Sequence, residues 1–248
     1  MISVLIFTRD DSEWLSRCLT SLAERPPREE FEVLVFDNVS QDSTAKVVRG
    51  WRGPRGMRAS LLQATEDTSF SRGNNLLIQA ARGDIGLILN PDTEPQGDLI
   101  DDAAALLRGD LSVVCVGPRL VFPDGSDQSN GWALPTPVQL LRERLARSQR
   151  TIPPHKSSQT DVGWLMGCFL MVRTSDLRDV DGFDERYWFF GTDLELCSRL
   201  GHIGRLVRLD EHLLVHRGHK GWPASRRQAT RKATLQWMLR SVPGWLTR

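Results

Sequence analysis

The chain has 248 residues and a formal net charge of +1, and 40% of its residues are apolar. This apolar fraction is sufficient for a substantial buried core, and the near-neutral charge gives no indication of nucleic-acid binding by the whole protein. The first residues do not have the basic and long apolar regions of a signal peptide, and no apolar run reaches membrane-spanning length. We therefore expect a cytoplasmic protein.

Basic residues are concentrated at the end of the chain, because no acidic residue follows Glu211. This basic segment either faces phosphates, acidic lipids or an acidic substrate, or forms a solvated helix face. Its tryptophans, Trp222, Trp237 and Trp245, either contact a membrane surface or pack the last helix. The oligomeric state stays open.

The cysteines are scattered and flanked by apolar residues, at positions 18, 115, 168 and 197. They form no CxxC pair, so the sequence predicts neither a zinc site nor a disulfide framework. Buried, reduced thiols are the expectation.

The first half of the chain alternates between apolar strands and amphipathic helices. Strands are predicted at 2–8, 30–38, 84–90 and 112–118, and helices beginning near Ser12 and Ser40 and spanning 71–83 and 99–107. Parallel strands that are covered on both faces are apolar throughout, as these are. The pattern predicts an α/β fold with a mostly parallel central sheet flanked by helices.

The second half is predicted to be mixed. A hairpin is expected at 119–129, followed by a loop-rich insertion at 126–160 with a short basic helix near 138–148. Strands are predicted at 162–173, 204–209 and 212–216, and helices at 192–204, with Thr192 as cap, and 224–242. Long irregular segments inside compact domains are usually functional or mobile.

Polar residues follow three of the predicted strands, at Thr8-Arg9-Asp10, Asp37-Asn38 and Asn90-Pro91-Asp92. Each alone is explained by turn or helix-cap chemistry. Because ligands in open α/β sheets bind beyond the carboxyl ends of the strands, the three together predict one crevice. The glycine-rich loops of P-loop and dinucleotide-binding proteins are missing, so a phosphate-bearing ligand would need a metal or basic residues.

Two later residues are further candidates. Asp193 begins a predicted helix after the aromatic run 188–190. The helix dipole favours a carboxylate there, which is a structural role, but a partly apolar pocket would also suit a general base. His216 ends a predicted strand and is either a metal ligand or a residue at the edge of the core, with His219 as a competitor.

Four segments, taken in order, resemble family 2 glycosyltransferases of the GT-A fold, and among them the bacterial rhamnosyltransferase-like branch. The likeness extends from about residue 2 to residue 235, and its segments are SVLIFTRDDSEWLSRCLTSL, VLVFDNVSQDST, SFSRGNNLLIQAARGDIGLILNPDTEP and GCFLMVRTSDLRDVDGFDERYWFFGTDLELCSRLGHIGRLVRLDEHLLVHRGHKG. The resemblance implies one domain over 1–248, with a nucleotide-sugar-binding half (1–118) and an acceptor-binding and catalytic half (119–248).

The resemblance also implies a reaction and its residues. An inverting, metal-dependent enzyme would transfer a sugar from a dTDP-, UDP- or GDP-sugar to a hydroxyl of a saccharide, a lipid-linked precursor or a small molecule. This function belongs to polysaccharide biosynthesis, and a lipid-linked acceptor would bring the protein to the inner face of the membrane. The implied residues are Thr8, Arg9, Asp37, Gly73, Asn74, Asn90 and Asp92 for the nucleotide-sugar, Asp92 and His216 for Mg²⁺ or Mn²⁺, and Asp193 as the base.

Two residues depart from the family pattern. Asn90 takes the place of the first acid of an Asp-x-Asp motif, and Thr192 takes the place of the glutamate in a Glu-Asp pair. These departures motivate the alternative of a catalytically degenerate sugar-nucleotide-binding protein. A nucleotidyltransferase is a further alternative, although the segment after the first strand has no glycine.

Overall fold

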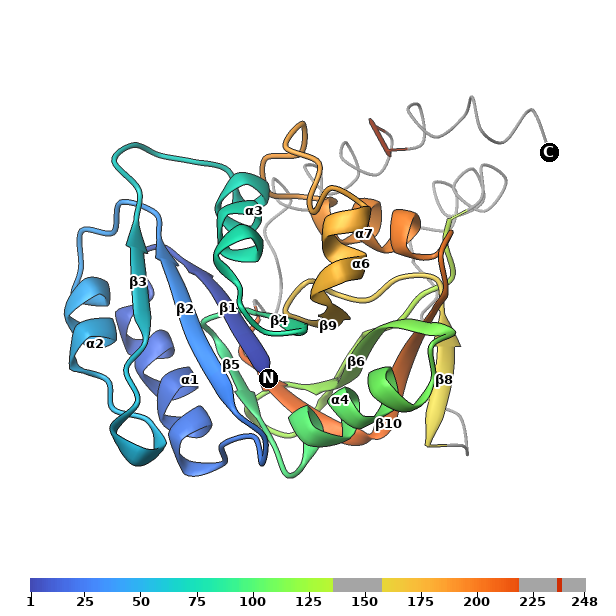
Figure 1. The fold of residues 1–248 in the computed structure, drawn as a ribbon, viewed down its shortest axis with the longest axis horizontal. Coiled ribbons are helices and arrows are strands. Elements are labelled where there is room, and N and C mark those ends of the chain that lie inside the picture. Colours follow the sequence, from blue (N-terminus) through green and yellow to red (C-terminus); the bar gives the residue numbers. More distant parts are fainter. Residues whose placement is uncertain (136–157, 219–235, 238–248) are drawn as a thin grey trace.

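The computed structural model describes residues 1–135, 158–218 and 236–237 (Figure 1). The described elements are β1 (Ile2–Thr8), α1 (Ser12–Glu24), β2 (Phe31–Asp37), α2 (Thr44–Gly50), η1 (Pro54–Gly56), β3 (Ser60–Gln63), α3 (Phe70–Ala80), β4 (Ile85–Leu89), β5 (Thr93–Pro95), α4 (Leu99–Gly109), β6 (Val113–Val121), β7 (Asp127–Gln128), β8 (Gln159–Val162), β9 (Phe169–Arg173), α6 (Thr174–Asp179), α7 (Thr192–Leu200) and β10 (Arg205–His216).

The strands form one mixed sheet in the order β3-β2-β1-β4-β9-β6-β10-β5, with β7 beside β6 and β8 beside β10. β1 to β4 are parallel, and β9 is antiparallel to both β4 and β6. β6 and β10 therefore run in the direction of β4, because β10 pairs with β6 in parallel. As a result, the carboxyl ends of β1, β2, β4 and β10 share one edge of the sheet.

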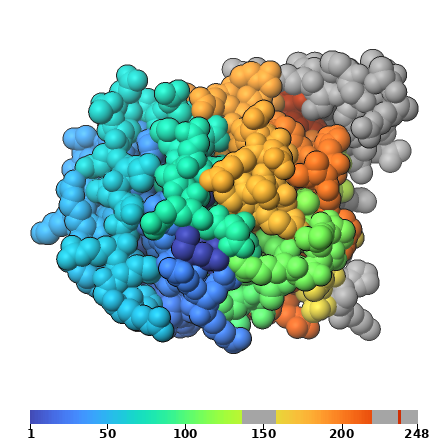
Figure 2. Space-filling model, viewed as in Figure 1, coloured from blue at the N-terminus to red at the C-terminus, as the bar shows by residue number. Residues whose placement is uncertain are grey.

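Helices cover both faces of this sheet (Figure 1). On one face, α1, α2 and α4 pack against alternate strand residues such as Ile2, Val4 and Ile6. On the other face, α3, α6 and α7 pack against residues such as Leu5 and Leu170. In the space-filling view, the surface of α3 (teal) adjoins that of α6 (golden yellow) without a break (Figure 2). Burial on two faces explains why apolar residues predominate in β1, β2 and β4.

The α/β architecture with a largely parallel first half is confirmed, but several predicted boundaries are wrong. The helix expected from Ser40 begins at Thr44, since Asp42 accepts hydrogen bonds from the backbone N–H groups of both Thr44 and Ser12 (2.9 Å each). Burial raises the pKa of Asp42, but the hydrogen bonds from Thr44 and Ser12 outweigh it and lower the pKa to about 2. One carboxylate thus stabilises the starts of α1 and α2 together.

The last part of the sheet also differs from the prediction. Residues 205–209 and 212–216 belong to a single strand, β10, with a register shift against β6 between Leu209 and Leu213. Asp210, between the two predicted strands, is accommodated because Arg208 Nε donates to its Oδ1 (2.5 Å) inside the protein. β3, β5 and α6 were not predicted, and the predicted strand at 162–173 begins only at Phe169.

Other expectations have a direct outcome. The four cysteines are buried and free, as predicted. Trp237 is buried against Tyr187 and Leu194, which supports packing over membrane contact for this residue. Trp222, Trp245, the helix near 138–148 and most of the helix at 224–242 lie outside the described residues. Within the described part of the chain, no helix has the length and hydropathy needed to span a bilayer.

Gly73 determines how closely α3 approaches the sheet. A Cβ atom at this position would lie 2.4 Å from Cδ2 of Phe7 and 3.0 Å from Cδ1 of Phe36. These two rings stack with centroids 5.8 Å apart, so they leave little room to move. Gly73 therefore lets the helix contact the aromatic rings at the end of β1 and β2.

We expect Gly73→Ala to lower the free energy of unfolding by about 1–3 kcal/mol, because the added methyl group overpacks this contact. Gly109→Ala is the matched control, since Gly109 also lies in a helix but a Cβ there meets no atom within 4 Å. That control should be neutral or slightly stabilising. Urea unfolding of the two variants measures the difference, and equal stabilities would contradict the close packing of α3.

Candidate functional site

The predicted residues at the ends of β1 and β2 are adjacent. Thr8 pairs with Asp37 in the parallel register of these strands. The Asp37 carboxylate is buried and accepts hydrogen bonds from the Ser40 N–H (3.0 Å) and the Gln63 side chain (3.2 Å). The buried Thr8 hydroxyl has no hydrogen-bond partner among the described residues. This edge therefore holds a fixed carboxylate beside an unused hydroxyl group.

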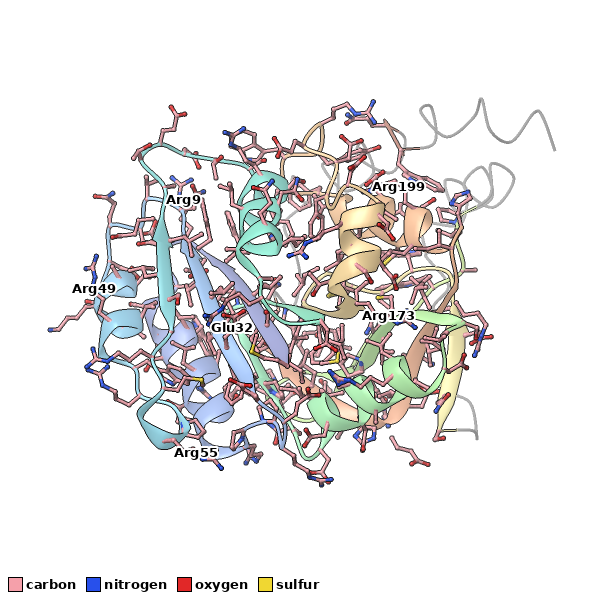
Figure 3. The ribbon with its side chains drawn as sticks, in the orientation of Figure 1. Arg9, Glu32, Arg49, Arg55, Arg173 and Arg199 are labelled. Carbon is pink, nitrogen blue, oxygen red and sulfur yellow. The ribbon has the colours of Figure 1, made fainter. Side chains whose placement is uncertain are left out.

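Arg9 and Asn38 hold the loop that leads into α3. Arg9 Nη1 donates to Asp67 Oδ1 (2.7 Å), and the Asn38 amide donates to the same oxygen (2.9 Å). Arg9 and then Asn38 lower the pKa of Asp67. Figure 3 places Arg9 at the sheet edge where this loop crosses. Arg9 is thus already neutralised, and a contact with a nucleotide stays a prediction.

The α3 residues of the prediction lie in the interior. Ser69 Oγ caps the helix by accepting the Arg72 N–H (3.0 Å). The Asn74 side chain is fully buried and donates to Phe70 O (2.9 Å), while its Oδ1 has no partner in the described part of the protein. Gly73 faces Phe7, as described above. Contacts of Gly73 and Asn74 with a donor stay predictions.

The structure brings Asp92 and His216 together. β5 pairs with the end of β10 so that Thr93 lies opposite His216, and Arg217 N donates to Asp92 O (3.0 Å). His216 Nε2 lies 3.5 Å from Asp92 Oδ1, and His216 Nδ1 lies 2.9 Å from Oε1 of Gln128. The predicted pair of metal ligands therefore meets at the sheet edge, although long stretches of chain separate the two residues.

Asp92 is the electrostatic centre of this edge. Burial raises its pKa, but the hydrogen bond and charge of His216 outweigh this effect, so the pKa of Asp92 is lowered. The pKa of the neighbouring Asp11, which precedes α1, shifts in the opposite direction. Burial first and the charge of Asp92 second raise the pKa of Asp11 to about 6. Two carboxyl groups thus lie close enough to influence each other.

Asp92 and His216 fit a divalent cation as two of its ligands. With Gln128 Oε1 as acceptor, His216 Nδ1 carries a hydrogen, so Nε2, which faces the Asp92 carboxylate, would be the nitrogen that binds a cation in place of its proton. Carboxylate oxygen suits Mg²⁺ or Mn²⁺. Across residues 1–135 and 158–218, no cluster of three or more His, Cys, Asp or Glu is placed to bind a metal. A bound anion and water would have to supply the other ligands.

Asn90, the departure from the Asp-x-Asp pattern, is fixed through its backbone. Its N–H donates to Cys168 O (3.0 Å), and its carbonyl accepts from the Thr93 hydroxyl (2.7 Å). These bonds connect the turn after β4 to the start of β9, and so they position Asp92.

Asp193 lies in the first turn of α7. Its Oδ2 accepts the Gly167 N–H (3.2 Å) and its Oδ1 accepts the Leu194 N–H (2.9 Å). Burial raises the pKa of Asp193 more than the hydrogen bonds from Leu194 and Gly167 lower it. The N-cap is Gly191, at φ 77°, and not Thr192 as predicted. Glycine adopts this left-handed backbone conformation without steric cost. Thr192 instead begins the helix, and its hydroxyl lies 3.2 Å from Phe189 O.

Side chains of α7 and α3 hold the segment that leads into α7. Arg199, labelled in Figure 3, pairs with Glu195 (2.7 Å from Nε) and donates to the carbonyls of Val180 and Gly182. Asn75 of α3 exchanges two hydrogen bonds with the backbone of Phe183 (2.7 and 2.9 Å). The segment that carries Asp193 is therefore anchored at several points.

Cys168 connects the two acidic positions. Burial raises the pKa of its thiol, and the charges of Asp92 and Asp193 raise it further. The charges of both carboxylates therefore reach the same buried thiol. Asn90 bonds to the Cys168 carbonyl and Asp193 to the N–H of Gly167, so both sides are fixed to the same short segment. Asp92 and Asp193 thus flank the same segment, and their joint role in one site stays a prediction.

The aromatic run before α7 is more exposed than expected for an apolar pocket. The side chains of Trp188 and Phe189 are 61% and 50% exposed. Their backbone is fixed, because Phe70 N donates to Trp188 O (2.9 Å) and the rings of Phe70 and Phe189 are in edge contact (5.7 Å). A rigid aromatic surface thus adjoins Asp193.

Several functional candidates were missed by reasoning from sequence. Asp11 could have been noted as the second acid after β1, and Asn75 as the second Asn of the Gly-Asn-Asn run. Gln128, the partner of His216, carries no sequence signal, because its role depends on the pairing of β6 with β7.

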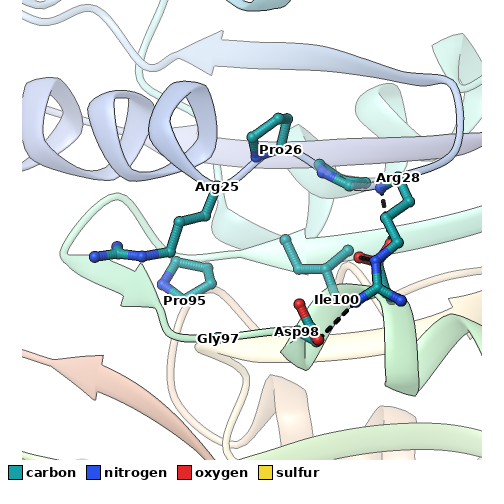
Figure 4. Close-up of a pocket in the computed structure, with 9 residues that line it drawn as sticks. Arg25, Pro26, Arg28, Pro95, Gly97, Asp98 and Ile100 are labelled. Atoms are coloured by element: carbon teal, nitrogen blue, oxygen red, sulfur yellow. Dashed lines mark hydrogen bonds and ion pairs between the residues drawn. The ribbon is translucent and has the colours of Figure 1, made fainter.

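A hollow of about 250 Å³ lies elsewhere, between residues 25–28 after α1 and residues 95–101 (Figure 4). An ion pair between Arg28 and Asp98 (2.6 Å) borders it. None of the predicted site residues lines this hollow, so it is described apart from the site.

Comparison with known proteins identifies the family. Residues 3–177 match the model of glycosyl transferase family 2, so the chain belongs to this family. It is 28% identical over 272 residues to N-acetylglucosaminyl-diphospho-decaprenol L-rhamnosyltransferase of Mycobacterium tuberculosis, which covers 99% of the chain and 86% of the relative. It is 24% identical over 264 residues to rhamnosyltransferase WbbL of Escherichia coli, which covers 100% of the chain and 93% of the relative.

Solved structures share the fold. The mannosyltransferase PcManGT of Pyrobaculum calidifontis, in complex with GDP-Man and Mn²⁺, superimposes with a TM-score of 0.69 at 18% identity, over 98% of this chain and 64% of that chain. TarS 1-349 of S. aureus superimposes with a TM-score of 0.61 at 20% identity, over 86% and 59%. The chain thus spans about 60% of these two proteins. The fold is GT-A, and the protein is a glycosyltransferase.

Proposed function

We propose that this glycosyltransferase is inverting and metal-dependent, and that it moves a sugar from a nucleotide-sugar to a hydroxyl group. The observation that carries the proposal is the arrangement around Gly167 and Cys168, with the Asp92–His216 pair on one side and the half-buried Asp193 on the other. A single displacement needs one base for the acceptor and positive charge for the leaving group. The two sides of the site match these two requirements.

Asp193 would act on the acceptor. Its carboxylate takes the proton of the acceptor hydroxyl, and the acceptor oxygen attacks the anomeric carbon opposite the leaving group. The bond to the nucleoside diphosphate breaks as the new glycosidic bond forms, which inverts the configuration. Burial favours this role, because it raises the pKa of Asp193 and makes the carboxylate a stronger base.

Asp92 and His216 would hold the cation on the donor side. A bound Mg²⁺ or Mn²⁺ would stabilise the negative charge that develops on the departing diphosphate. Thr8 and Asp37 would border the nucleotide, since they lie at the adjacent strand ends.

The relatives suggest the class of substrate. Two of them are named as rhamnosyltransferases, and one name specifies a lipid-diphosphate-linked N-acetylglucosamine acceptor. The solved neighbours contain GDP-Man, UDP or UDP-GlcNAc. We infer a hexosyl or deoxyhexosyl donor and a saccharide or lipid-linked acceptor, used at the membrane surface. A thermal-shift screen of dTDP-, UDP- and GDP-sugars with Mn²⁺ identifies the donor, because a ligand of the folded state raises its stability.

Asp193→Asn should reduce the transfer rate at least about 100-fold while donor binding persists, because the variant lacks the general base. Transfer of radiolabelled sugar and donor calorimetry measure the two quantities. Glu195→Gln is the control, since this first-turn acid pairs with Arg199 and should keep most of the turnover. Near-wild-type turnover by Asp193→Asn would exclude Asp193 as the base. Donor binding without transfer in the wild type would indicate a degenerate member.

The pH dependence follows from the raised pKa of Asp193. Only the ionised carboxylate can accept a proton, so kcat should fall as the pH decreases through this raised pKa. The acidic limb of the kcat profile should therefore lie above the ordinary carboxyl range. An acidic limb that lies within the ordinary carboxyl range would contradict the assignment of Asp193 as the base.

Asp92→Ala should weaken Mn²⁺-dependent binding of the nucleoside diphosphate by at least about tenfold, since it removes one ligand and leaves His216 alone. Glu94→Gln is the control, because Glu94 lies only two residues after Asp92 but pairs with Arg17 (2.8 Å). Calorimetry with and without Mn²⁺ separates the metal-dependent part of nucleotide binding from the metal-independent part. Unchanged affinity of Asp92→Ala would count against the metal site.

A further inference from the structure

Arg217 is presented on an aromatic surface beside the site. Its guanidinium lies over the ring of Trp14, 3.9 Å from the centroid. Its backbone N–H donates to Asp92 O (3.0 Å), and it directly follows His216. Arg217 is exposed, yet this stacking restricts its side chain, which would otherwise be mobile.

Trp14 contacts two arginines, and only one of them has an acidic partner. Arg17 lies 5.1 Å from the same ring and pairs with Glu94 (2.8 Å). Arg9, the other arginine at this edge, pairs with Asp67 (2.7 Å). Within the described part of the chain, no carboxylate lies within ion-pair distance of Arg217. Its positive charge is therefore available to a ligand.

Trp14 also determines where this charge lies. It lies in the first turn of α1, and Asp11 is the N-cap residue of the same helix. Asp11 is close enough to Asp92 to have its pKa raised by that charge. Arg217, stacked on Trp14, therefore borders the acidic edge formed by Asp11 and Asp92.

This edge needs positive charge in order to bind a diphosphate. Asp11, Asp37 and Asp92 are all acidic, and a nucleoside diphosphate is itself an anion. A cation held by Asp92 and His216 offsets only part of this charge, and Asn90 leaves one metal-binding acid in the turn. A guanidinium offers several fixed donors that match phosphate oxygens.

We propose that Arg217, held in place by Trp14, binds the diphosphate of the donor and stabilises the leaving nucleoside diphosphate. This inference rests on the proposed function, and it assigns the diphosphate to a side chain outside the metal pair. In the reaction, the guanidinium keeps its proton and contacts the diphosphate oxygens on which charge develops.

The test is calorimetry of UDP, dTDP and GDP with Mn²⁺, followed by variants with the nucleotide that binds best. Arg217→Gln should weaken its binding about tenfold, as expected for a lost charge-assisted hydrogen bond. Arg217→Lys should lose less, and Trp14→Leu should lose about threefold because the cation–π contact is gone. Arg17→Gln, the matched control on the same ring, should stay within about twofold. The corresponding nucleoside without phosphates should bind all variants alike.

Each result has a defined meaning. Equal affinity of Arg217→Gln and the wild type would overturn the role of Arg217 and leave the proposed function intact. An equal loss of affinity in Arg17→Gln would show that general surface charge causes the weaker binding, and it would also overturn the role of Arg217. If the wild type binds none of these diphosphates with Mn²⁺, the proposed function fails together with this inference. Thermal unfolding of Arg217→Gln should match the wild type, because the side chain is exposed.

Discussion

The pairing of β5 with the end of β10 is the constraint on which the site depends. These strands are far apart in sequence, and their antiparallel register sets Thr93 opposite His216. That register brings Asp92 within 3.5 Å of His216 and places Arg217 against Trp14. A slip by one residue would turn His216 to the opposite face of the sheet and separate the pair. The pair formed by Asp92 and His216 is thus a product of sheet geometry.

The second organising feature is the segment at Gly167 and Cys168. Its backbone forms hydrogen bonds with Asn90 in the turn after β4 and with Asp193 at the start of α7. The site therefore combines a carboxylate whose pKa is lowered by a histidine with one whose pKa is raised by burial. Such divergent environments allow two acids to have different roles, one toward a cation and one toward a proton.

Much of the donor side could be predicted from sequence, because it depends on local signals. The apolar runs of β1, β2 and β4 and the polar residues that end them define the sheet edge without any tertiary information. Asp193 and His216 were candidates from their places in the predicted elements, and the resemblance to the family chose among their possible roles. What sequence could not supply depends on pairing over long distances. The role of Gln128 follows from the hairpin against β6, and Gly191 caps α7 because the chain arrives there in a left-handed conformation. The sequence predicted two strands in place of β10, because only the tertiary structure shows that Asp210 is paired inside the protein.

The central claim is that Asp92 and His216 bind a cation that carries the diphosphate of the donor. A crystal structure with Mn²⁺ and the preferred nucleoside diphosphate, with anomalous data at the manganese edge, tests it most directly. The account predicts an anomalous peak within bonding distance of an Asp92 oxygen and His216 Nε2, with diphosphate oxygens completing the coordination. A bound nucleotide with the manganese peak elsewhere, and Asp92 still paired directly with His216, would contradict it.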